Sequence, residues 1–341
     1  MNAVPEPVHA APVAVREGVL ELEQPLPLYF GGQLENVRVA WRLVGDPAAP
    51  VVAALGGISA GRAVIDSGTE KGWWSDIIGP GRALDSSRYR ILGIDFLGGS
   101  GASTGPRAGQ VDFPSIASQD QAEILRRVAE HLKLGPLAAI VGASYGGMVA
   151  LAFAERWPDR VKRIIVISAA HRPHPMATAW RSVQRAVVRF GARNEQGAEG
   201  LRLARALAMA TYRSHTEFEQ RFSGPPTRVD GRFQFPVESY LLARGDAYAA
   251  SYIPEAFVCL SESIDLHQVE PSNIRVPTWL VAVIEDQLVP LADMRALMKT
   301  LGGPAQLVEL SSLYGHDAFL KETQALRDVF TRALSNTGDV K

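Results

Sequence analysis

The feature that most limits the possible folds is a stretch in which strand-like and helix-like segments alternate. The apolar run LAAIV and the turn GASYGG are followed by MVALAFAERW, which has helical character, and then by the β-rich run VKRIIVISAA. A strand, a helix and a second strand in this order favour two parallel strands joined by a crossover helix. This segment therefore predicts a mostly parallel sheet with helices on both faces.

The same alternation continues toward both ends of the chain, but it is interrupted in the middle. Between about residues 171 and 271 the sequence has no clear strand and two long helical patterns, RPHPMATAWRSVQRAVVRF and GLRLARALAMATYRSHTEFEQRF, the second ending at Phe222. We therefore expect an α/β core over 25–170 and 272–341, a helical lid inserted at 171–271, and a flexible leader over 1–24. The further expected strands are VRVAWRLVG, PVVAAL, RYRILGIDFL, PTWLVAVIE and AQLVELSS, and the further expected helices are IASQDQAEILRRVAEHL and ETQALRDVFTRAL.

Composition and charge exclude several classes of function. The formal net charge of −1 does not support nucleic acid or an anionic membrane as a partner. No apolar run approaches the roughly 20 residues that a membrane span requires. The N-terminus lacks the basic flank and apolar segment of a signal peptide, and the single cysteine, Cys259, excludes an internal disulfide. We expect a soluble protein of the cytoplasm.

Ser144 is the strongest candidate for a chemical role. It stands in Gly142-Ala143-Ser144-Tyr145-Gly146, which fits the pattern G-x-S-x-G at the junction of an expected strand and helix. A serine at such a sharp turn is pushed above the edge of the sheet, and glycines on either side avoid steric collisions. The alternative is a plain tight turn, but the strand–turn–helix context favours a nucleophile.

A nucleophilic serine needs a base and a carboxylate that orients the base. Asp286 follows the strand PTWLVAVIE, and His316 lies between the last strand and the final helix, which gives the order Ser, Asp, His. Glu285 is a rival for the carboxylate, but it should point to the opposite face. Five other histidines are interpreted as structural or surface residues: His131, His171, His174, His215 and His267. No set of His, Cys and acidic residues has metal-ligand spacing, so no bound metal or cofactor is expected.

Stabilising the oxyanion requires two backbone N–H donors. Tyr145 N–H, at the start of the helix after Ser144, is the first candidate. The loop GGISAG follows the strand PVVAAL, and its glycines allow close approach to a substrate. Ile58 N–H is the expected second donor, and a plain glycine turn is the alternative.

At this point the sequence resembles the homoserine O-acyltransferase family, the α/β-hydrolase-fold acyltransferases of methionine biosynthesis. The resemblance covers roughly residues 25 to 325. It is carried in family order by KGWWSDIIGPGRALDSSRYRILGIDFLGGSGASTGP, DFPSIASQDQ, GASYGGMVALAFAERWPDRV, TYRSHTEFEQRF, VESYL and YGHDAF.

The resemblance implies an α/β-hydrolase fold with a lid and a two-step acyl transfer. Ser144 would take the acyl group from acetyl-CoA or succinyl-CoA, and the hydroxyl of L-homoserine would accept it. Arg213 would bind the carboxylate of the acceptor and Asp317 its amino group. The lid helices would form a homodimer. Apart from the resemblance, arginine is the only cationic residue besides histidine in the insertion, and such arginines could meet the phosphates of CoA. The alternative is that they are solvated residues of amphipathic helices.

Two departures from the family leave specificity open. The oxyanion loop of the family usually reads His-Ala-Leu-Thr-Gly, whereas this chain has Gly56-Gly57-Ile58-Ser59-Ala60, and Phe257 stands where a tyrosine is usual. Arg62 is a candidate for binding a succinyl carboxylate, with a solvent-facing arginine as the alternative. The acceptor could be L-serine instead of homoserine. Two other functions remain, a serine hydrolase of the esterase or aminopeptidase type and a non-catalytic binding protein.

Overall fold

The computed structural model describes residues 14–68 and 70–335. Its main sheet has eight strands in the order β1-β4-β8-β5-β9-β10-β13-β14. The pairs β1–β4 and β4–β8 are antiparallel and all the others are parallel, which confirms the expected mostly parallel α/β sheet. In chain order the strands are β1 (Val15–Glu21), β4 (Arg38–Val44), β5 (Val51–Leu55), β8 (Arg90–Ile94), β9 (Ala139–Ala143), β10 (Ile164–Ile167), β13 (Thr278–Val283) and β14 (Ala305–Leu310).

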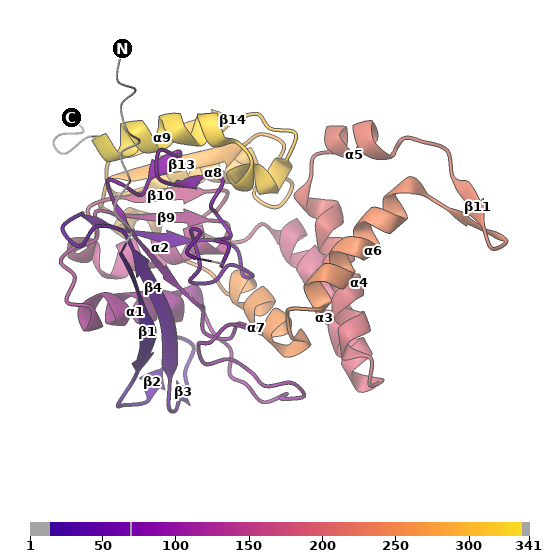
Figure 1. Ribbon diagram of the computed structural model, residues 1–341, viewed down its shortest axis with the longest axis horizontal. Helices are drawn as coiled ribbons and strands as arrows, with labels where there is room; N and C mark the ends of the chain where they lie inside the picture. Colours follow the sequence, from indigo (N-terminus) through magenta and orange to yellow (C-terminus); the bar gives the residue numbers. More distant parts are fainter. Residues whose placement is uncertain (1–13, 69, 336–341) are drawn as a thin grey trace, which may run out of the picture.

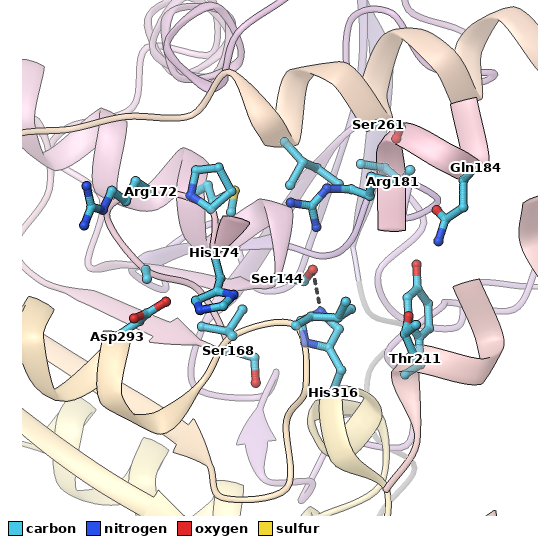
Figure 2. A pocket seen from close by; sticks show the side chains of 18 of the residues that line it. Ser144, Ser168, Arg172, His174, Arg181, Gln184, Thr211, Ser261, Asp293 and His316 are labelled. Atoms are coloured by element: carbon cyan, nitrogen blue, oxygen red, sulfur yellow. Dashed lines mark hydrogen bonds between the residues drawn. The ribbon is translucent and has the colours of Figure 1, made fainter. Parts of the chain in front are cut away.

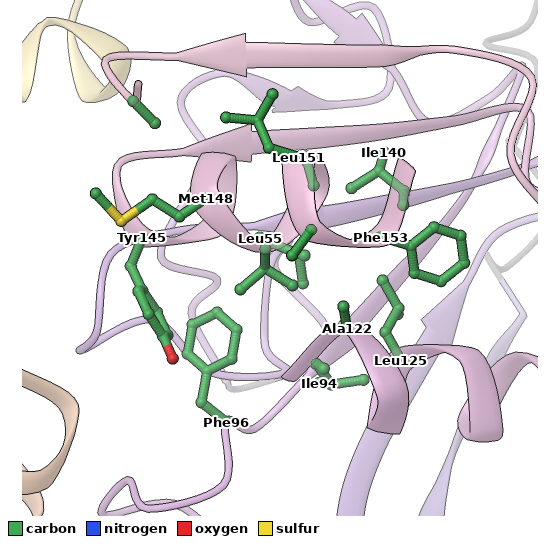
Figure 3. Packing of buried hydrophobic residues seen from close by; sticks show 14 of the residues in the cluster. Leu55, Ile94, Phe96, Ala122, Leu125, Ile140, Tyr145, Met148, Leu151 and Phe153 are labelled. Atoms are coloured by element: carbon green, nitrogen blue, oxygen red, sulfur yellow. The ribbon is translucent and has the colours of Figure 1, made fainter. Parts of the chain in front are cut away.

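Side chains alternate between two hydrophobic layers along the central strands. In β10, Ile164 and Val166 pack into one layer, whereas Ile165 and Ile167 pack into the other. The first layer lies under α1 (Ser118–His131), α2 (Tyr145–Arg156) and α8 (Leu291–Thr300), and Figure 3 shows part of it. The second lies under α9 (Thr323–Ser335) and the segment that holds the short strands β6 (Ile78–Gly79) and β7 (Leu84–Asp85). Burial on both faces explains why these strands are continuous apolar runs.

The inserted segment forms a helical lid beside the sheet (Figure 1). Its helices are α3 (Pro175–Arg193), α4 (Gly197–Tyr212), α5 (His215–Phe222), α6 (Pro236–Ala249) and α7 (Pro254–Asp265). Helix α4 packs between α3 and α6, and α7 packs against α3 on the side of the core. The lid contacts the core through α7, through α4 against residues 315–320, and through Tyr248 of α6 near Ser59.

Two expectations for the lid were wrong. The lid contains an antiparallel hairpin of β11 (Thr227–Val229) and β12 (Arg232–Gln234), joined at Asp230 and Gly231, which both have positive φ. An Asp-Gly turn is a strong hairpin signal, but the exposed strands have no apolar alternation that would reveal them. The long helix expected up to Phe222 is broken at Arg213, whose backbone is extended. A new helix begins there because the Ser214 hydroxyl caps it, accepting the N–H of Glu217 at 3.1 Å.

The leader expected over 1–24 was also wrong in part. Residues 1–13 lie outside the described residues, but Val15–Glu21 form β1 along the whole length of β4. Most of this edge strand is exposed, so it lacks the apolar pattern by which a strand is recognised. The ring of Trp41 in β4 lies against Gly18, where an added Cβ would come within 2.9 Å of it.

The remaining short elements complete the core. A two-stranded ribbon of β2 (Leu26–Pro27) and β3 (Gln33–Leu34) precedes β4, and β6 pairs with β7. Three 3₁₀ helices, η1 (Pro158–Arg160), η2 (Pro271–Asn273) and η3 (Gly315–Leu320), lie within the described residues. Of these, η3 places a candidate catalytic residue.

Candidate active site

Ser144 occupies a strained turn between β9 and α2. Its φ is 54° and its ψ is −121°, a conformation that is costly for a residue with a Cβ. The turn fits only because two neighbours are glycines. A Cβ on Gly142 would lie 2.1 Å from Gly146 O, and a Cβ on Gly146 would lie 2.3 Å from Leu55 O. Glycine is therefore required at both positions for the turn that exposes the Ser144 hydroxyl at the sheet edge.

His316 and Asp286 reach Ser144 from two other strand ends. His316 Nε2 lies 2.8 Å from Ser144 Oγ, and His316 Nδ1 lies 2.7 Å from Asp286 Oδ2. The second oxygen, Oδ1 of Asp286, accepts the backbone N–H groups of Leu288 at 2.8 Å and Val289 at 3.0 Å. The structure thus brings together the three residues expected from the sequence. Glu285 lies elsewhere, accepting Ser311 Oγ at 2.6 Å and Ser312 N–H at 2.8 Å.

The surroundings of His316 make it a stronger base than an ordinary histidine. Burial alone would lower its pKa, but the charge of Asp286, its hydrogen bond and the charge of Asp317 outweigh burial, and the pKa is raised. The positive charge of Arg181 acts in the opposite direction. A buried imidazole held by a carboxylate can accept the Ser144 proton and later return it.

The two expected oxyanion donors belong to segments that meet beside Ser144. Gly146 N–H donates to Gly56 O at 2.8 Å, which fixes the loop after β5 against the start of α2. Ile58 is buried and lines the same pocket as Ser144. Tyr145 is the first residue of α2, where backbone N–H groups have no partner within the helix.

Aromatic residues of the lid hold this oxyanion loop, residues 56–60. Tyr252 Oη donates to Ile58 O at 2.9 Å, and Tyr248 Oη lies 3.2 Å from Ser59 Oγ. Tyr145 Oη is bonded at 2.5 Å to Ser263 Oγ of α7. Both expected oxyanion donors are therefore tied to lid residues through other atoms of the same residue.

A pocket opens over Ser144 between the sheet edge and the lid. It encloses about 680 Å³, including space open to solvent, and Figure 2 shows its walls. Apolar residues on one part of its wall include Met148, Phe257 and Leu288. Polar side chains also line it, namely Ser168, Arg172, His174, Arg181, Gln184, Thr211, Ser261 and Asp293. The mixed lining suits a ligand with both apolar and charged parts.

Arg213 and Asp317 face each other instead of lining this pocket. Arg213 Nε lies 3.1 Å from Asp317 Oδ2, although the angle is not that of a hydrogen bond, and Arg213 Nη1 lies 3.4 Å from Glu217 Oε2. Burial raises the pKa of Asp317, and the positive charges of Arg213 and Arg205 oppose this rise. Asp317 follows His316 directly, so the Arg213–Asp317 pair is adjacent to the base. In this structure the two side chains contact each other.

Arg62 does not reach the pocket. Its Nη1 lies 2.5 Å from Asp95 Oδ2, and its backbone N–H donates to Asp95 Oδ1 at 2.7 Å. It is absent from the pocket lining, and no described interaction joins it to Ser144 or His316. This placement gives no support to Arg62 as an acyl-binding residue.

Several pocket residues were not singled out from the sequence. Arg181 and Gln184 lie one turn apart on α3. On the other side of the pocket are Arg172, from the loop before α3, and Asp293, in the first turn of α8. His174, interpreted as structural, lines the pocket and also caps α3, its Nδ1 accepting the Met176 N–H at 3.2 Å. One signal in the sequence was missed. Gln184 and Arg185 are consecutive polar residues of an amphipathic helix, and both are buried in the structure.

Neither a metal site nor a membrane helix is found in the part of the chain that the structure describes. Across residues 14–68 and 70–335, no cluster of His, Cys, Asp and Glu could hold a metal ion. Within those same ranges, no helix is long and apolar enough to cross a membrane.

Comparisons with known proteins agree with the geometry. The family model described as alpha/beta hydrolase fold matches residues 57–323. The chain is 43% identical to a homoserine O-succinyltransferase of Xanthomonas campestris pv. campestris, over 96% of this chain and 86% of that protein. It is 32% identical to a homoserine O-acetyltransferase of Clavibacter michiganensis subsp. michiganensis, over 90% of each. A solved homoserine O-acetyltransferase from Bacillus anthracis superposes with a TM-score of 0.85 at 19% identity, over 96% of this chain and 99% of that one.

Proposed function

This chain belongs to the homoserine O-acyltransferase family of the α/β-hydrolase fold, and we propose that it transfers an acyl group from acyl-CoA to the hydroxyl of L-homoserine. The observation that carries the proposal is the continuous hydrogen-bond chain Ser144–His316–Asp286 at the wall of a pocket. Acylated homoserine is an intermediate of methionine biosynthesis in this family. We place the reaction in the cytoplasm.

In the first half of the reaction Ser144 becomes acylated. His316 Nε2 accepts the hydroxyl proton while Ser144 Oγ attacks the thioester carbonyl. The negative oxygen that forms is stabilised by the N–H groups of Ile58 and Tyr145. When the carbon–sulfur bond breaks, His316 returns the proton to sulfur, so that CoA leaves as the thiol. Asp286 keeps the ring in the tautomer that has Nδ1 protonated.

In the second half the acceptor takes the place of CoA. His316 accepts the proton of the homoserine hydroxyl, which attacks the acyl carbonyl, and then gives the proton to Ser144 Oγ as the ester bond to the enzyme breaks. We propose that the acceptor inserts between Arg213 and Asp317, replacing their mutual contact by two new ones. Its carboxylate would pair with Arg213 and its ammonium with Asp317.

We also propose that the protein is a homodimer formed through the lid. Helix α3 carries an exposed apolar stripe in which Met176, Val183 and Phe190 recur every seven residues, with exposed fractions of 52%, 54% and 70%. A stripe of this kind on a soluble protein suits a symmetric helix-to-helix contact. Replacing Val183 and Phe190 by glutamate should give a monomer by light scattering after size exclusion. An unchanged mass would contradict this part of the proposal.

The function is tested by release of CoA from the purified protein. Acetyl-CoA and succinyl-CoA are each supplied alone, with L-homoserine, and with L-serine, and the acylated product is identified by mass spectrometry. We expect rapid release only with homoserine. Release that is indifferent to the amino acid would indicate a thioesterase or esterase, release with serine alone would indicate a serine acyltransferase, and no release with any pair would overturn the proposal.

A further inference from the structure

Arg181 of α3 presents an unpaired edge of its guanidinium to the pocket. Its Nε and Nη2 donate to Asp265 Oδ1 at 2.8 and 2.6 Å. Among the described residues, no hydrogen bond or ion pair involves its Nη1. The side chain is only 12% exposed, and Arg181 lines the pocket together with Ser144 and His316. A buried guanidinium with a free edge is a binding group for an anion.

Arg181 shares its carboxylate partner, Asp265, with a second arginine. Asp265 is shared by two guanidiniums, since Arg185 Nη1 also donates to its Oδ2 at 2.6 Å. Arg185 completes its hydrogen bonds on Ser261 O at 3.0 Å and Ser261 Oγ at 3.1 Å. One carboxylate thus pairs with two guanidiniums, and all three side chains are at most 12% exposed. Of the two cations, Arg181 lines the pocket and Arg185 does not.

The position of Arg181 fits the acyl group more closely than the acceptor. Figure 2 shows its guanidinium projecting from α3 toward Ser144 and His316. Its positive charge lowers the pKa of His316, so it lies within electrostatic reach of the base. The proposed acceptor site lies outside this pocket lining: Arg213 follows the end of α4, and Asp317 lies in η3. Next to Arg181, the amide of the buried Gln184 and the hydroxyl of Ser261 offer further polar contacts.

We propose that Arg181 binds the free carboxylate of a dicarboxylic acyl group, so that the preferred donor is succinyl-CoA. This inference rests on the proposed function, because it requires the acyl group to be carried on Ser144. Three carbon–carbon bonds separate the two carboxyl carbons of a succinyl group, which lets the free carboxylate extend from Ser144 toward the lid. An acetyl group would leave the charge of Arg181 uncompensated. The 43% identity with a homoserine O-succinyltransferase supports the same choice.

The test compares donors in one variant. In Arg181→Gln we expect kcat/KM for succinyl-CoA to fall by about 10- to 100-fold, since a hydrogen-bonded charge is lost, while kcat/KM for acetyl-CoA and butyryl-CoA stays within about threefold. Asp265 keeps its contact with Arg185 in this variant, and retained acetyl transfer shows that the protein is folded. Arg189→Gln is the matched control, since Arg189 lies on the same helix with a side chain 52% exposed.

The outcomes separate this inference from the proposed function. Equal losses with all donors would mean that Arg181 supports the lid, and a loss confined to the KM of homoserine would mean that it binds the acceptor. Either result overturns the inference, as does a wild-type preference for acetyl-CoA over succinyl-CoA. The proposed function itself fails only if the wild-type protein does not acylate homoserine with any of the acyl-CoA donors. Arg181→Lys, which keeps the charge but not the fork, should recover part of the succinyl activity.

Discussion

At the sheet edge Ser144 and Asp286 are fixed by backbone, whereas in the lid Arg181 is fixed by another side chain. Ser144 is placed by a strained turn, and Asp286 is held by two backbone N–H groups. Arg181, in contrast, is held by Asp265, which is held in turn by Arg185. Under the proposed function, the sheet edge carries the residues that react, and the lid carries Arg181 and Arg213, the proposed binding residues for the acyl group and the acceptor.

The largest effect expected at the sheet edge comes from removing the nucleophile. Ser144→Ala should lower kcat by about 10⁴-fold or more, because the acyl-enzyme cannot form. Intact-protein mass spectrometry after mixing with acyl-CoA should show the added acyl mass on the wild type alone. An acylated Ser144→Ala protein would place the nucleophile elsewhere.

A smaller but still large effect is expected on stability when the turn is filled. Gly146→Ala should reduce the free energy of unfolding by about 3 kcal/mol, since the new Cβ would lie 2.3 Å from the rigid carbonyl of Leu55. In the lid, the new Cβ of Gly197→Ala would come no nearer than 3.4 Å to any atom, the nearest being the Cγ of Pro254, and the substitution should cost far less. Denaturant unfolding measures both, with Gly135→Ala, which has no atom within 4 Å, as the control. Equal losses for the core and lid glycines would break the comparison.

Substitution of the proposed acceptor cation should affect only one half of the reaction. Arg213→Lys should lower kcat/KM for homoserine by about 10- to 100-fold, because lysine cannot replace the planar fork of arginine. The kcat/KM for the CoA donor should stay unchanged. Arg221→Lys is the control, since Arg221 also pairs with Glu217 but is 43% exposed. A loss in the donor step would show that Arg213 does not belong to the acceptor site.

The smallest expected effect is a shift in the pH dependence of kcat/KM, through which the charge of Arg181 in the lid acts on His316 at the sheet edge. His316 must be neutral to act as a base, so activity is lost as the pH falls through its pKa. That pKa is raised above the ordinary 6.5, because Asp286 and Asp317 outweigh burial and the charge of Arg181. We expect the acid limb of kcat/KM for acetyl-CoA above pH 6.5, and in Arg181→Gln at still higher pH. A limb that moves downward in the variant would contradict this arrangement.

Sequence reasoning predicted the sheet and the meeting of Asp286 and His316 beside Ser144 for the same physical reason. Strands buried on both faces are apolar runs, and the carboxyl ends of parallel strands meet at one edge, so Asp286 and His316 could be assigned by their place after a strand. The edge strand β1 and the hairpin β11–β12 were missed because exposed strands need no apolar pattern.

The polar wall of the pocket was harder to predict than the triad. Helical periodicity tells which face of α3 is buried but not what that face meets, and Arg181 acquires its orientation from Asp265 of α7, about 80 residues later in the chain. Arg62 shows the opposite error. Because Arg62 is close to Ile58 in sequence, it was a candidate for the pocket, but its guanidinium pairs with Asp95 instead.

The contacts between the lid tyrosines and the oxyanion loop have a consequence for side reactions. Tyr252 holds Ile58 O, Tyr248 meets Ser59, and Tyr145 is bonded to Ser263 of α7. If α6 and α7 move away to admit CoA, Ile58 loses its contact with Tyr252, whereas Gly56 stays bonded to the Gly146 N–H at the start of α2. The N–H of Ile58, the proposed oxyanion donor of this loop, is then held less firmly, so an acyl group on Ser144 should hydrolyse more slowly while the pocket is open than its exposure to water alone would suggest.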